Sequence, residues 1–285
     1  MSDSGPAPRR LSWLDVFTDR PFAGNPLAVV PEADGLSGEQ MQALAAELGL
    51  SETVFALEDA RRIRIFTPTT ELPLAGHPTV GVAHELARLG RIPAEGRWMF
   101  KTGAGDIAVD LAGDVATMTQ AEPQLGLEHD LPAVVAALQV DEDALVSPPQ
   151  MCTTTGVRQL FAEVRDRDAL AALTPDQTLV AGLENVDLLA AWCEVADGEV
   201  AQRGFAPQLG IAEDPATGSA AGALAALRVF RGATPGPLMV RQGEEIGRPS
   251  EMRAEVEGEP GTPTEVRVGG RAVLVFEGEI DLPAI

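Results

Sequence analysis

Residues that build covalent or metal-centred sites are scarce in this chain. Cys152 and Cys193 are the only cysteines among 285 residues, which excludes a disulfide framework and a multi-thiol metal site. The three histidines, His77, His84 and His129, do not match the clustered spacing of zinc ligands. We therefore expect a protein that works with no metal and no organic cofactor.

Long apolar runs are absent as well. No uninterrupted apolar stretch approaches 18 residues, and residues 1–10 are polar and lack the apolar core of a secretion signal. We expect a cytoplasmic protein with no membrane partner. The chain also has no tyrosine, 9 phenylalanines and 3 tryptophans, which argues against a large flat ligand.

Positive charge is scarce. The chain has 21 Lys and Arg residues against 43 Asp and Glu residues, for a net charge of −22. Such a surface repels phosphate backbones, so we expect no nucleic-acid partner. An anionic substrate would need a locally positive pocket. Apolar residues make up 45% of the chain, and its length suits two domains with buried cores.

The chain carries one internal repeat. Residues 64–68 (Arg-Ile-Phe-Thr-Pro) and residues 203–207 (Arg-Gly-Phe-Ala-Pro) share the pattern Arg-x-Phe-x-Pro, 139 positions apart. Each copy leads into a segment that runs 14 positions from one glycine to another, from Gly76 to Gly90 and from Gly218 to Gly232. These matching landmarks, in the same order, favour a duplication over chance.

Both glycine-bounded segments predict helices. Pro78 suits a first-turn position, and Val82 and Leu86 recur at helical spacing. Residues 220–227 are small and apolar, which is typical of a helix enclosed by a sheet. We expect the second glycine of each segment to end its helix in the left-handed conformation.

Two further segments read as capping boxes. Residues 37–40 (Ser-Gly-Glu-Gln) predict a helix that Gly49 closes, and residues 174–177 (Thr-Pro-Asp-Gln) predict a looser helix to about Leu183. Strands are expected at residues 13–17, 27–30, 53–57, 62–66, 160–164, 238–240 and 272–276. Pro123 and Pro132 bracket acidic residues, so we place a linker near residues 121–132.

The two glycine-started helices suggest a ligand pocket. If a pseudo-two-fold axis relates the halves, both helix N-termini can point into one cleft and offer unpaired N–H groups and partial positive charge. Glycine at Gly76 and Gly218 would let a carboxylate approach the backbone closely. For one copy alone, a tight turn is the simpler interpretation; for two matching copies, we favour the pocket.

Reactive side chains flank both helix starts. His77 lies at the first, and Asp214 and Ser219 lie at the second. Taken singly, His77 would be an ordinary core residue, Ser219 an N-cap and Asp214 a turn residue before Pro215. Their equivalent places in two copies favour function. Glu52, between a predicted helix and strand, carries little weight on pattern alone.

Several runs resemble the PhzF-like (phenazine biosynthesis-like) family. In the N-terminal half they are residues 24–29 (Gly-Asn-Pro-Leu-Ala-Val), 50–55 (Leu-Ser-Glu-Thr-Val-Phe), 64–68 and 71–79 (Glu-Leu-Pro-Leu-Ala-Gly-His-Pro-Thr). In the C-terminal half they are residues 213–222 (Glu-Asp-Pro-Ala-Thr-Gly-Ser-Ala-Ala-Gly) and 242–250 (Gln-Gly-Glu-Glu-Ile-Gly-Arg-Pro-Ser). The resemblance extends from about residue 12 to residue 280.

The resemblance implies an α/β (α+β) fold of the diaminopimelate-epimerase-like type. Two duplicated domains, residues 1–125 and 126–285, would each wrap a curved, largely antiparallel sheet around a central helix. The C-terminal strand could return to the first domain. The active site would lie in the interdomain cleft, and the protein would be a homodimer.

The resemblance also implies an isomerase that moves a proton on a small carboxylate-bearing metabolite of the dihydro-hydroxyanthranilate type. The acid–base glutamate of the family falls on Glu52, and its supporting residues fall on His77, Asp214 and Ser219. Substrate-binding positions are expected at Asn25, Gly76, Thr217 and Gly218.

Two alternatives stay open at this stage. One is an epimerase-fold enzyme with another substrate and reaction, and the other is a non-catalytic small-molecule-binding homologue. Related racemases use two thiols, and Ala75 and Ala216 stand where those relatives place cysteine. Cys152 and Cys193 lie elsewhere in the chain, and we expect them to be small buried residues. Two-thiol racemisation is therefore disfavoured.

Overall fold

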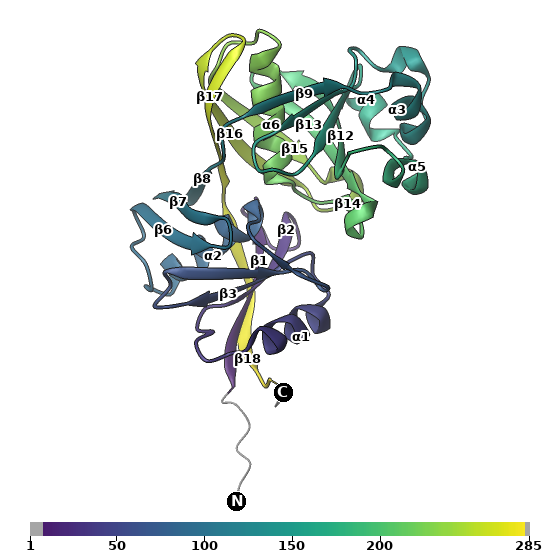
Figure 1. Cartoon of the computed structure of the whole chain (residues 1–285). Helices are drawn as coiled ribbons and strands as arrows, with labels where there is room; N and C mark the ends of the chain where they lie inside the picture. Colours follow the sequence, from purple (N-terminus) through teal and green to yellow (C-terminus); the bar gives the residue numbers. More distant parts are fainter. Residues whose placement is uncertain (1–7, 283–285) are drawn as a thin grey trace, which may run out of the picture. The chain divides into compact units, whose positions relative to one another are not determined.

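The computed structural model describes residues 8–282, which fall into two compact units (Figure 1). The first unit holds the chain up to Met118 and from Gly270 onward, and the second unit is Thr119–Gly269. The predicted boundary at residues 125 and 126 thus differs from the observed one. Residues 1–7 of the polar N-terminal segment lie outside the described residues.

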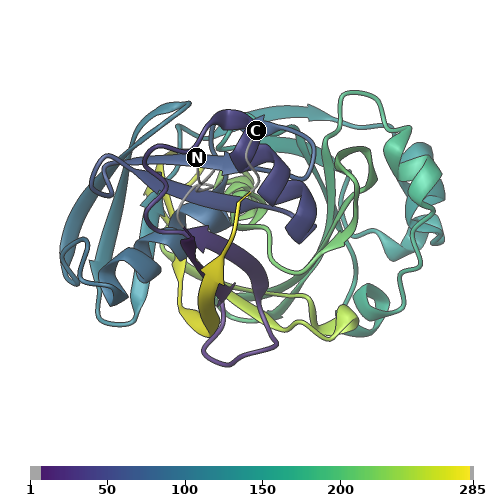
Figure 2. The same cartoon turned by 90° about the horizontal axis from the view of Figure 1, so that it is seen from below.

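Strand pairing explains why the last strand belongs to the first unit. Strand β18 (Ala272–Ile280) pairs antiparallel with β1 (Arg9–Val16) along its whole length. Figures 1 and 2 both show the yellow β18 beside the purple β1. The stacked rings of Trp13 and Phe276, 5.7 Å between centroids, reinforce this pairing.

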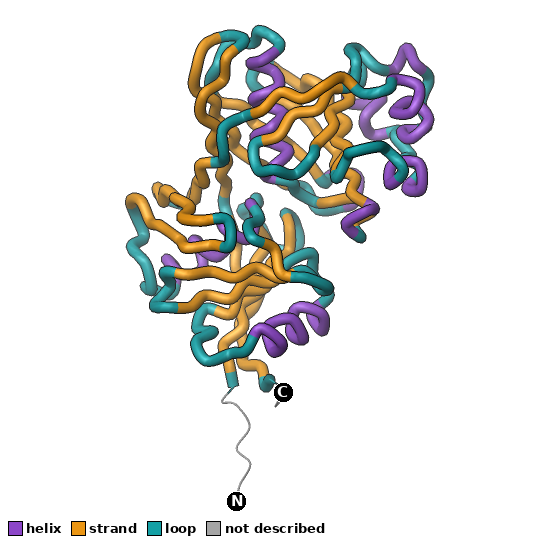
Figure 3. The backbone as a smooth tube through the Cα atoms, viewed as in Figure 1, coloured by secondary structure: helices purple, strands orange, loops and turns teal. Residues whose placement is uncertain are grey.

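Strands are the more frequent regular element in both units (Figure 3). Residues 8–282 also contain six α-helices and three short 3-10 turns, so the predicted mixed α/β class is confirmed. The first unit consists of β1, β2 (Asn25–Val30), α1 (Gly38–Leu48), β3 (Thr53–Leu57), β4 (Arg62–Phe66), β5 (Glu71–Leu72), α2 (Gly76–Arg88), β6 (Gly96–Thr102), β7 (Gly105–Ala112), β8 (Val115–Thr119) and β18.

The second unit contains nine strands and four of the six helices. In chain order these are β9 (Gln124–Glu128), α3 (Leu131–Leu138), β10 (Gln150–Thr153), β11 (Gln159–Glu163), α4 (Arg167–Ala171), α5 (Gln177–Ala181), β12 (Leu188–Ala196), β13 (Glu199–Ala206), β14 (Ile211–Asp214), α6 (Gly218–Phe230), β15 (Pro237–Gln242), β16 (Ser250–Glu259) and β17 (Thr262–Gly270). All seven predicted strands are present, although several extend beyond their predicted limits.

Each unit pairs its strands in the same order. In the first unit, β1–β2, β3–β4, β4–β5, β6–β7 and β7–β8 are antiparallel, whereas β2–β3 and β4–β6 are parallel. In the second unit, β10–β11, β12–β13, β13–β14, β15–β16 and β16–β17 are antiparallel, whereas β11–β12 and β13–β15 are parallel. Strand β9 pairs antiparallel with β10 as β18 does with β1.

The helices α2 and α6 pack into the cores of their units. Helix α6 is buried from Ala220 to Leu227, as its small apolar sequence predicted, and it contacts β10, β11 and β16. Helix α2 contacts β1, β2, β3, β7 and β18. It lies so close to the sheet at Gly81 that an added Cβ would come within 2.4 Å of Leu27. Each helix start is therefore held in place by the sheet around it.

Both helices end as predicted. Gly90 and Gly232 have φ values of 68° and 98°, in the left-handed region that favours glycine. At each end the glycine N–H and the next N–H bond back to the last turn: Gly90 to Ala87 and Arg91 to Leu86 in α2, with the same pattern in α6. This pair of bonds defines a Schellman motif. The two predicted helix ends are therefore the same structure.

One predicted capping box is correct and the other is wrong. Ser37 and Gln40 bond reciprocally at the start of α1, and Gly49 ends this helix with a φ of 63°. Helix α5 is instead capped by Asp176, whose carboxylate accepts from the N–H groups of Thr178 and Leu179. An aspartate one residue before the helix satisfies its first N–H groups directly. Helix α5 accordingly starts at Gln177 and ends at Ala181, before the predicted Leu183.

The predicted linker at residues 121–132 is also wrong. Residues 124–128 form strand β9, which pairs with β10, and α3 begins at Leu131 with Asp130 as its N-cap. The prolines and acidic residues that suggested a linker flank a strand at the edge of a sheet, where proline and charge are common.

The repeated Arg-x-Phe-x-Pro pattern has a structural cause. In each copy the arginine forks onto a glutamate of the following strand, Arg64 onto Glu71 and Arg203 onto Glu213. Each guanidinium also lies over the phenylalanine two residues later, 5.0 Å from the ring centre in the first unit and 5.2 Å in the second. The pattern thus ties β4 to β5 and β13 to β14.

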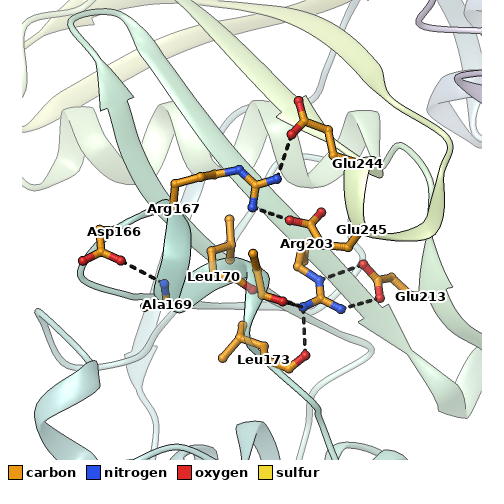
Figure 4. Close-up of polar contacts among 10 residues, drawn as sticks. Asp166, Arg167, Ala169, Leu170, Leu173, Arg203, Glu213, Glu244 and Glu245 are labelled. Atoms are coloured by element: carbon orange, nitrogen blue, oxygen red, sulfur yellow. Dashed lines mark hydrogen bonds and ion pairs between the residues drawn. The ribbon is translucent and has the colours of Figure 1, made fainter.

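Arg203 has a further role in the second unit. Figure 4 shows its guanidinium between the Glu213 carboxylate and backbone carbonyls at the end of α4. It donates to the carbonyls of Leu170, Ala171 and Leu173 at 3.1, 3.4 and 2.9 Å. Nearby, Arg167 pairs with Glu244 and Glu245. These ion pairs fasten the loop after β15 and the short helix α4 to the sheet.

Candidate active site

The first candidate half-site lies at the start of α2. Its N-cap residue is Ala75, which has no side-chain group to accept from the N–H groups of the first turn. These N–H groups and the helix dipole favour an anion at this end. His77 is the second residue of the helix and is 6% exposed, and the predicted ligand-contacting Gly76 is the first.

Glu52 lies next to this helix start. It sits in the short loop between Gly49, which ends α1, and Thr53, which begins β3. Its Oε2 atom is 3.5 Å from Nδ1 of His77, and its side chain is 14% exposed. Among the described residues, Oε2 has no hydrogen-bond partner. The structure therefore brings the predicted Glu52 and His77 together.

Burial changes the acidity of Glu52. Loss of water around the carboxylate raises the pKa of Glu52 from 4.5 to about 7, against a smaller lowering by a hydrogen bond from Ser51. The 3.5 Å separation from His77 is longer than a charge-assisted hydrogen bond. A carboxyl group with this pKa can accept and return a proton near neutral pH.

Asn25 belongs to the first unit's sheet. It is the first residue of β2, stands opposite Val16 of β1 and is 1% exposed. The adjacent Gly24 has a φ of 65°, and a Cβ there would lie 2.3 Å from the carbonyl oxygen of Val16. Only glycine fits this turn, which sets where β2 begins.

The second candidate half-site lies at the start of α6. Thr217 precedes the helix, and its hydroxyl donates to Oδ2 of Asp214 at 2.5 Å. The side chain of Gln242 bridges the same segment: its Nε2 donates to the Asp214 carbonyl at 2.7 Å, and its Oε1 accepts from the Thr217 N–H at 3.1 Å. Gln202 in turn donates to Gln242 Oε1 at 2.8 Å.

Ser219 is the second residue of α6 and corresponds in position to His77 in α2. Its Oγ accepts a hydrogen bond of 2.8 Å from Nε2 of Gln159, the first residue of β11. The structure thus groups Asp214, Thr217, Gly218 and Ser219 around one helix start within the second unit.

The phenazine biosynthesis-like protein family (PhzC-PhzF) matches residues 14–278. The chain belongs to this family. The prediction that it is an isomerase of the PhzF family is likewise confirmed.

The relatives of this PhzF-family protein match it over nearly their whole length. The trans-2,3-dihydro-3-hydroxyanthranilate isomerase of Pseudomonas fluorescens is 38% identical, over 94% of this chain and 98% of that protein. The crystal structure of a Bacillus anthracis phenazine biosynthesis protein of the PhzF family superposes with a TM-score of 0.88 at 25% identity, over 96% of this chain and 99% of that one. Its similarity supports the fold over nearly the whole chain.

More distant structures share the fold alone. A hydroxyproline epimerase from Agrobacterium vitis superposes with a TM-score of 0.63 at 15% identity, over 96% of this chain and 92% of that one. This likeness shows that the two proteins share a fold.

Neither cysteine of the PhzF-family chain belongs to the residues that form the two helix starts. Cys152 and Cys193 are buried in β10 and β12, and burial raises the pKa of both thiols, that of Cys152 to about 12. Such thiols are poor proton carriers at neutral pH. The N-cap residues of the two helices are Ala75 and Thr217.

Three residues around α6 were missed by the sequence analysis. Gln159, Gln202 and Gln242 are all at most 2% exposed, and each hydrogen-bonds at the second half-site. A polar side chain at an inward position of a strand was the available signal, since buried amides need partners. Gln242 stood in a quoted family run but had no assigned role.

The loop after β15 gives a testable prediction about how the second half-site is supported. Gly243 has a φ of 81°, and a Cβ there would lie 2.4 Å from the Arg248 carbonyl and 2.6 Å from the Pro215 carbonyl. Gly247 has a φ of 71° with nothing within 4 Å. Gly247→Ala is expected to lower the free energy of unfolding by about 1–2 kcal/mol, because alanine is strained in the left-handed backbone conformation. Gly243→Ala should lower the free energy of unfolding by about 1–3 kcal/mol more, because its methyl group would crowd the two carbonyls.

Urea unfolding of the two variants measures this difference. Because Pro215 lies just before α6, we also expect Gly243→Ala, and not Gly247→Ala, to weaken ligand binding at the helix start. Equal losses of stability in the two variants would show that the close contact has no energetic weight.

Proposed function

We propose that this protein catalyses a cofactor-independent proton transfer on a small carboxylate-bearing metabolite of the trans-2,3-dihydro-3-hydroxyanthranilate type, with Glu52 as acid and base. The observation that carries the proposal is the buried Glu52 carboxylate, with a pKa of about 7, beside the start of α2. The named isomerase from Pseudomonas fluorescens supports the substrate class, because it resembles this chain over nearly its whole length.

The reaction needs one group that changes its protonation state twice. The Glu52 carboxylate takes a proton from one carbon of the substrate, the electron pair shifts through the conjugated system, and the carboxylic acid returns a proton to another carbon. One C–H bond breaks, another forms, and the formula of the substrate is unchanged. A pKa near the working pH makes both steps accessible.

The other site residues would bind and orient the substrate. The N–H groups at the starts of α2 and α6, together with Ser219, would hold its carboxylate and the negative charge that develops during transfer. His77 and Asp214 would hydrogen-bond its polar substituents, with Asn25 and Thr217 as further binding residues. The matched strand pairing of the two units supports a duplicated epimerase-like fold, and we propose that both helix starts take part in substrate binding.

Two further expectations stay predictions. The cytoplasmic location is expected because the sequence has no long apolar run and no secretion signal, and the homodimer follows from the family resemblance alone. Among residues 8–282, no helix is long and apolar enough to cross a bilayer. Sedimentation of the purified protein measures the oligomeric state.

The function is tested by incubating the purified protein with trans-2,3-dihydro-3-hydroxyanthranilate and following the mixture by proton NMR. Loss of substrate signals, with a product of unchanged mass, is the expected result. An unchanged spectrum over hours at micromolar enzyme overturns this substrate and directs the assay to other small carboxylates.

The acidity of Glu52 predicts how stability depends on pH. Because the pKa of Glu52 is about 7 in the folded protein and 4.5 ordinarily, the folded state binds more protons between these values. The contribution of Glu52 to stability therefore falls as pH rises from about 4.5 to 7, by about 3 kcal/mol in total. Glutamine cannot ionise, so Glu52→Gln should match the wild type near pH 4.5 and exceed it by about this amount at pH 8.

Urea unfolding of both proteins across this pH range measures the effect. Exposed Glu47 in α1 provides the control, since Glu47→Gln and the wild type should have nearly the same stability at every pH. A constant difference between wild type and Glu52→Gln would show that the carboxyl group has an ordinary pKa.

A further inference from the structure

We propose that Gln159 is a positioning residue that turns the Ser219 hydroxyl into a hydrogen-bond donor for the anionic group of the ligand. This inference rests on the proposed function, in which Ser219 binds the substrate carboxylate. It assigns a role to a residue of β11 that is far from α6 in the sequence but contacts it through one bond.

The direction of the hydrogen bond carries the inference. Nε2 of Gln159 is a donor only, so Oγ of Ser219 accepts the 2.8 Å bond between them. The hydroxyl proton of Ser219 is then left to donate elsewhere, and no described residue accepts it. With the amide reversed, both N–H hydrogens of Gln159 would be without a partner, instead of one N–H hydrogen and the oxygen. Unpaired buried N–H groups are rarer than under-satisfied oxygens.

The Gln159 side chain does not contact solvent, so solvation does not explain a polar residue at this position. Its side chain is fully buried, between its neighbours Cys152 on β10 and Leu188 on β12. Its Oε1 is buried and has no hydrogen-bond partner among the described residues. A buried unpartnered amide oxygen destabilises a fold, and an apolar side chain of this size would avoid the cost. The amide therefore serves the residue that it contacts, Ser219.

The backbone at this helix start is fixed separately. Gln120 donates from Nε2 to the Gly218 carbonyl at 3.0 Å, and its Oε1 accepts from the Thr154 hydroxyl at 2.5 Å. Gly222 leaves the room for this amide, because a Cβ there would lie 2.0 Å from Gln120 Oε1. With the main chain held in this way, the rotation of the Ser219 hydroxyl is the remaining freedom, and Gln159 restricts it.

The experiment compares four proteins: wild type, Gln159→Met, Ser219→Ala and the double variant. Turnover of trans-2,3-dihydro-3-hydroxyanthranilate gives KM and kcat. Fluorescence titration with 3-hydroxyanthranilate, the aromatic analogue that has no hydrogen to transfer in this way, gives a Kd without turnover. Gln177→Met is the matched control, because Gln177 also has a buried, unpartnered amide oxygen but lies in α5.

We expect Gln159→Met to raise KM and the analogue's Kd about tenfold, the usual weight of a hydrogen bond to a charged group. Ser219→Ala should do the same, and the double variant should be no worse than Ser219→Ala alone, because both changes remove one interaction. Gln159→Glu should weaken binding further, since its carboxylate would accept the Ser219 proton. Gln177→Met should bind as the wild type does.

Protein stability separates positioning from a structural role. Gln159→Met should unfold at the same or a higher urea concentration than the wild type, whereas a structural amide would lower it. Wild-type binding by Gln159→Met, or losses that add in the double variant, overturns the inference. If the wild type binds the analogue but converts no substrate, the proposed reaction fails while the role of Gln159 is still decided by Kd. A wild type that does not bind the analogue overturns both.

Discussion

Glu52→Gln is expected to lower kcat on the true substrate by about 10²–10⁴-fold while changing the Kd of a non-reacting analogue by less than about threefold. Glutamine keeps the size of the side chain and its place in the loop before β3. It cannot accept a proton, and a positioned acid–base group contributes this range of rate. Single-turnover kinetics with trans-2,3-dihydro-3-hydroxyanthranilate measures the chemical step without product release.

Two comparisons sharpen this expectation. Glu47→Gln, on the exposed side of α1, should retain wild-type turnover and control for the loss of one negative charge. His77→Asn should reduce turnover less than Glu52→Gln, because we assign His77 to substrate binding. Full activity of Glu52→Gln would remove the acid–base role from this residue.

The largest expected change in stability follows from replacing Arg203. Arg203 is 6% exposed, and its guanidinium forks onto Glu213 and donates to three carbonyls at the end of α4 (Figure 4). Arg203→Met would leave Glu213 buried without a partner and those carbonyls without a donor. Breaking one side of such a buried pair costs about 3–5 kcal/mol.

The repeat supplies a matched control for this experiment. Arg64 makes the corresponding fork to Glu71, but their side chains are 23% and 43% exposed. Arg64→Met should therefore cost only about 0–1 kcal/mol. Urea unfolding of both variants measures the two losses. Equal losses of stability in the two variants would show that burial of the ion pair does not determine how much it stabilises the fold. The double variant Arg203→Met with Glu213→Leu should recover part of the stability, since no unpaired charge remains.

Local signals predicted the helices and their ends well. The glycines at 49, 90 and 232 ended their helices because only glycine adopts positive φ without cost. The capping box of Ser37 was predicted correctly because it is local: both of its hydrogen bonds join residues three apart. The box of Thr174 failed because Asp176 competes for the same N–H groups from a better position.

Non-local features were less accessible. The linker prediction failed because strand β9 is stabilised by its partner β10, and pairing between strands does not show in composition. The return of β18 to the first unit depends on β1, at the other end of the chain. Gln159, Gln202 and Gln242 come from three strands and meet only in the folded unit, so no spacing in the sequence predicts them.

The candidate residues divided in the same way. Gly76, His77, Gly218 and Ser219 followed from the repeat, since each pair occupies the first two positions of its helix. Glu52 depended on the family resemblance, because its burial and its distance to His77 arise from tertiary packing. The raised pKa of Glu52 is a property of that packing and not of its neighbours in sequence.

Transfer of a proton through Glu52 is the central claim, and deuterium incorporation tests it most directly. Wild type and Glu52→Gln are incubated with trans-2,3-dihydro-3-hydroxyanthranilate in deuterated water, and the product is examined by proton NMR and mass spectrometry. Wild type should give a product with deuterium on carbon, and Glu52→Gln should give no such product. Product without carbon-bound deuterium, formed equally fast by both proteins, would contradict the claim.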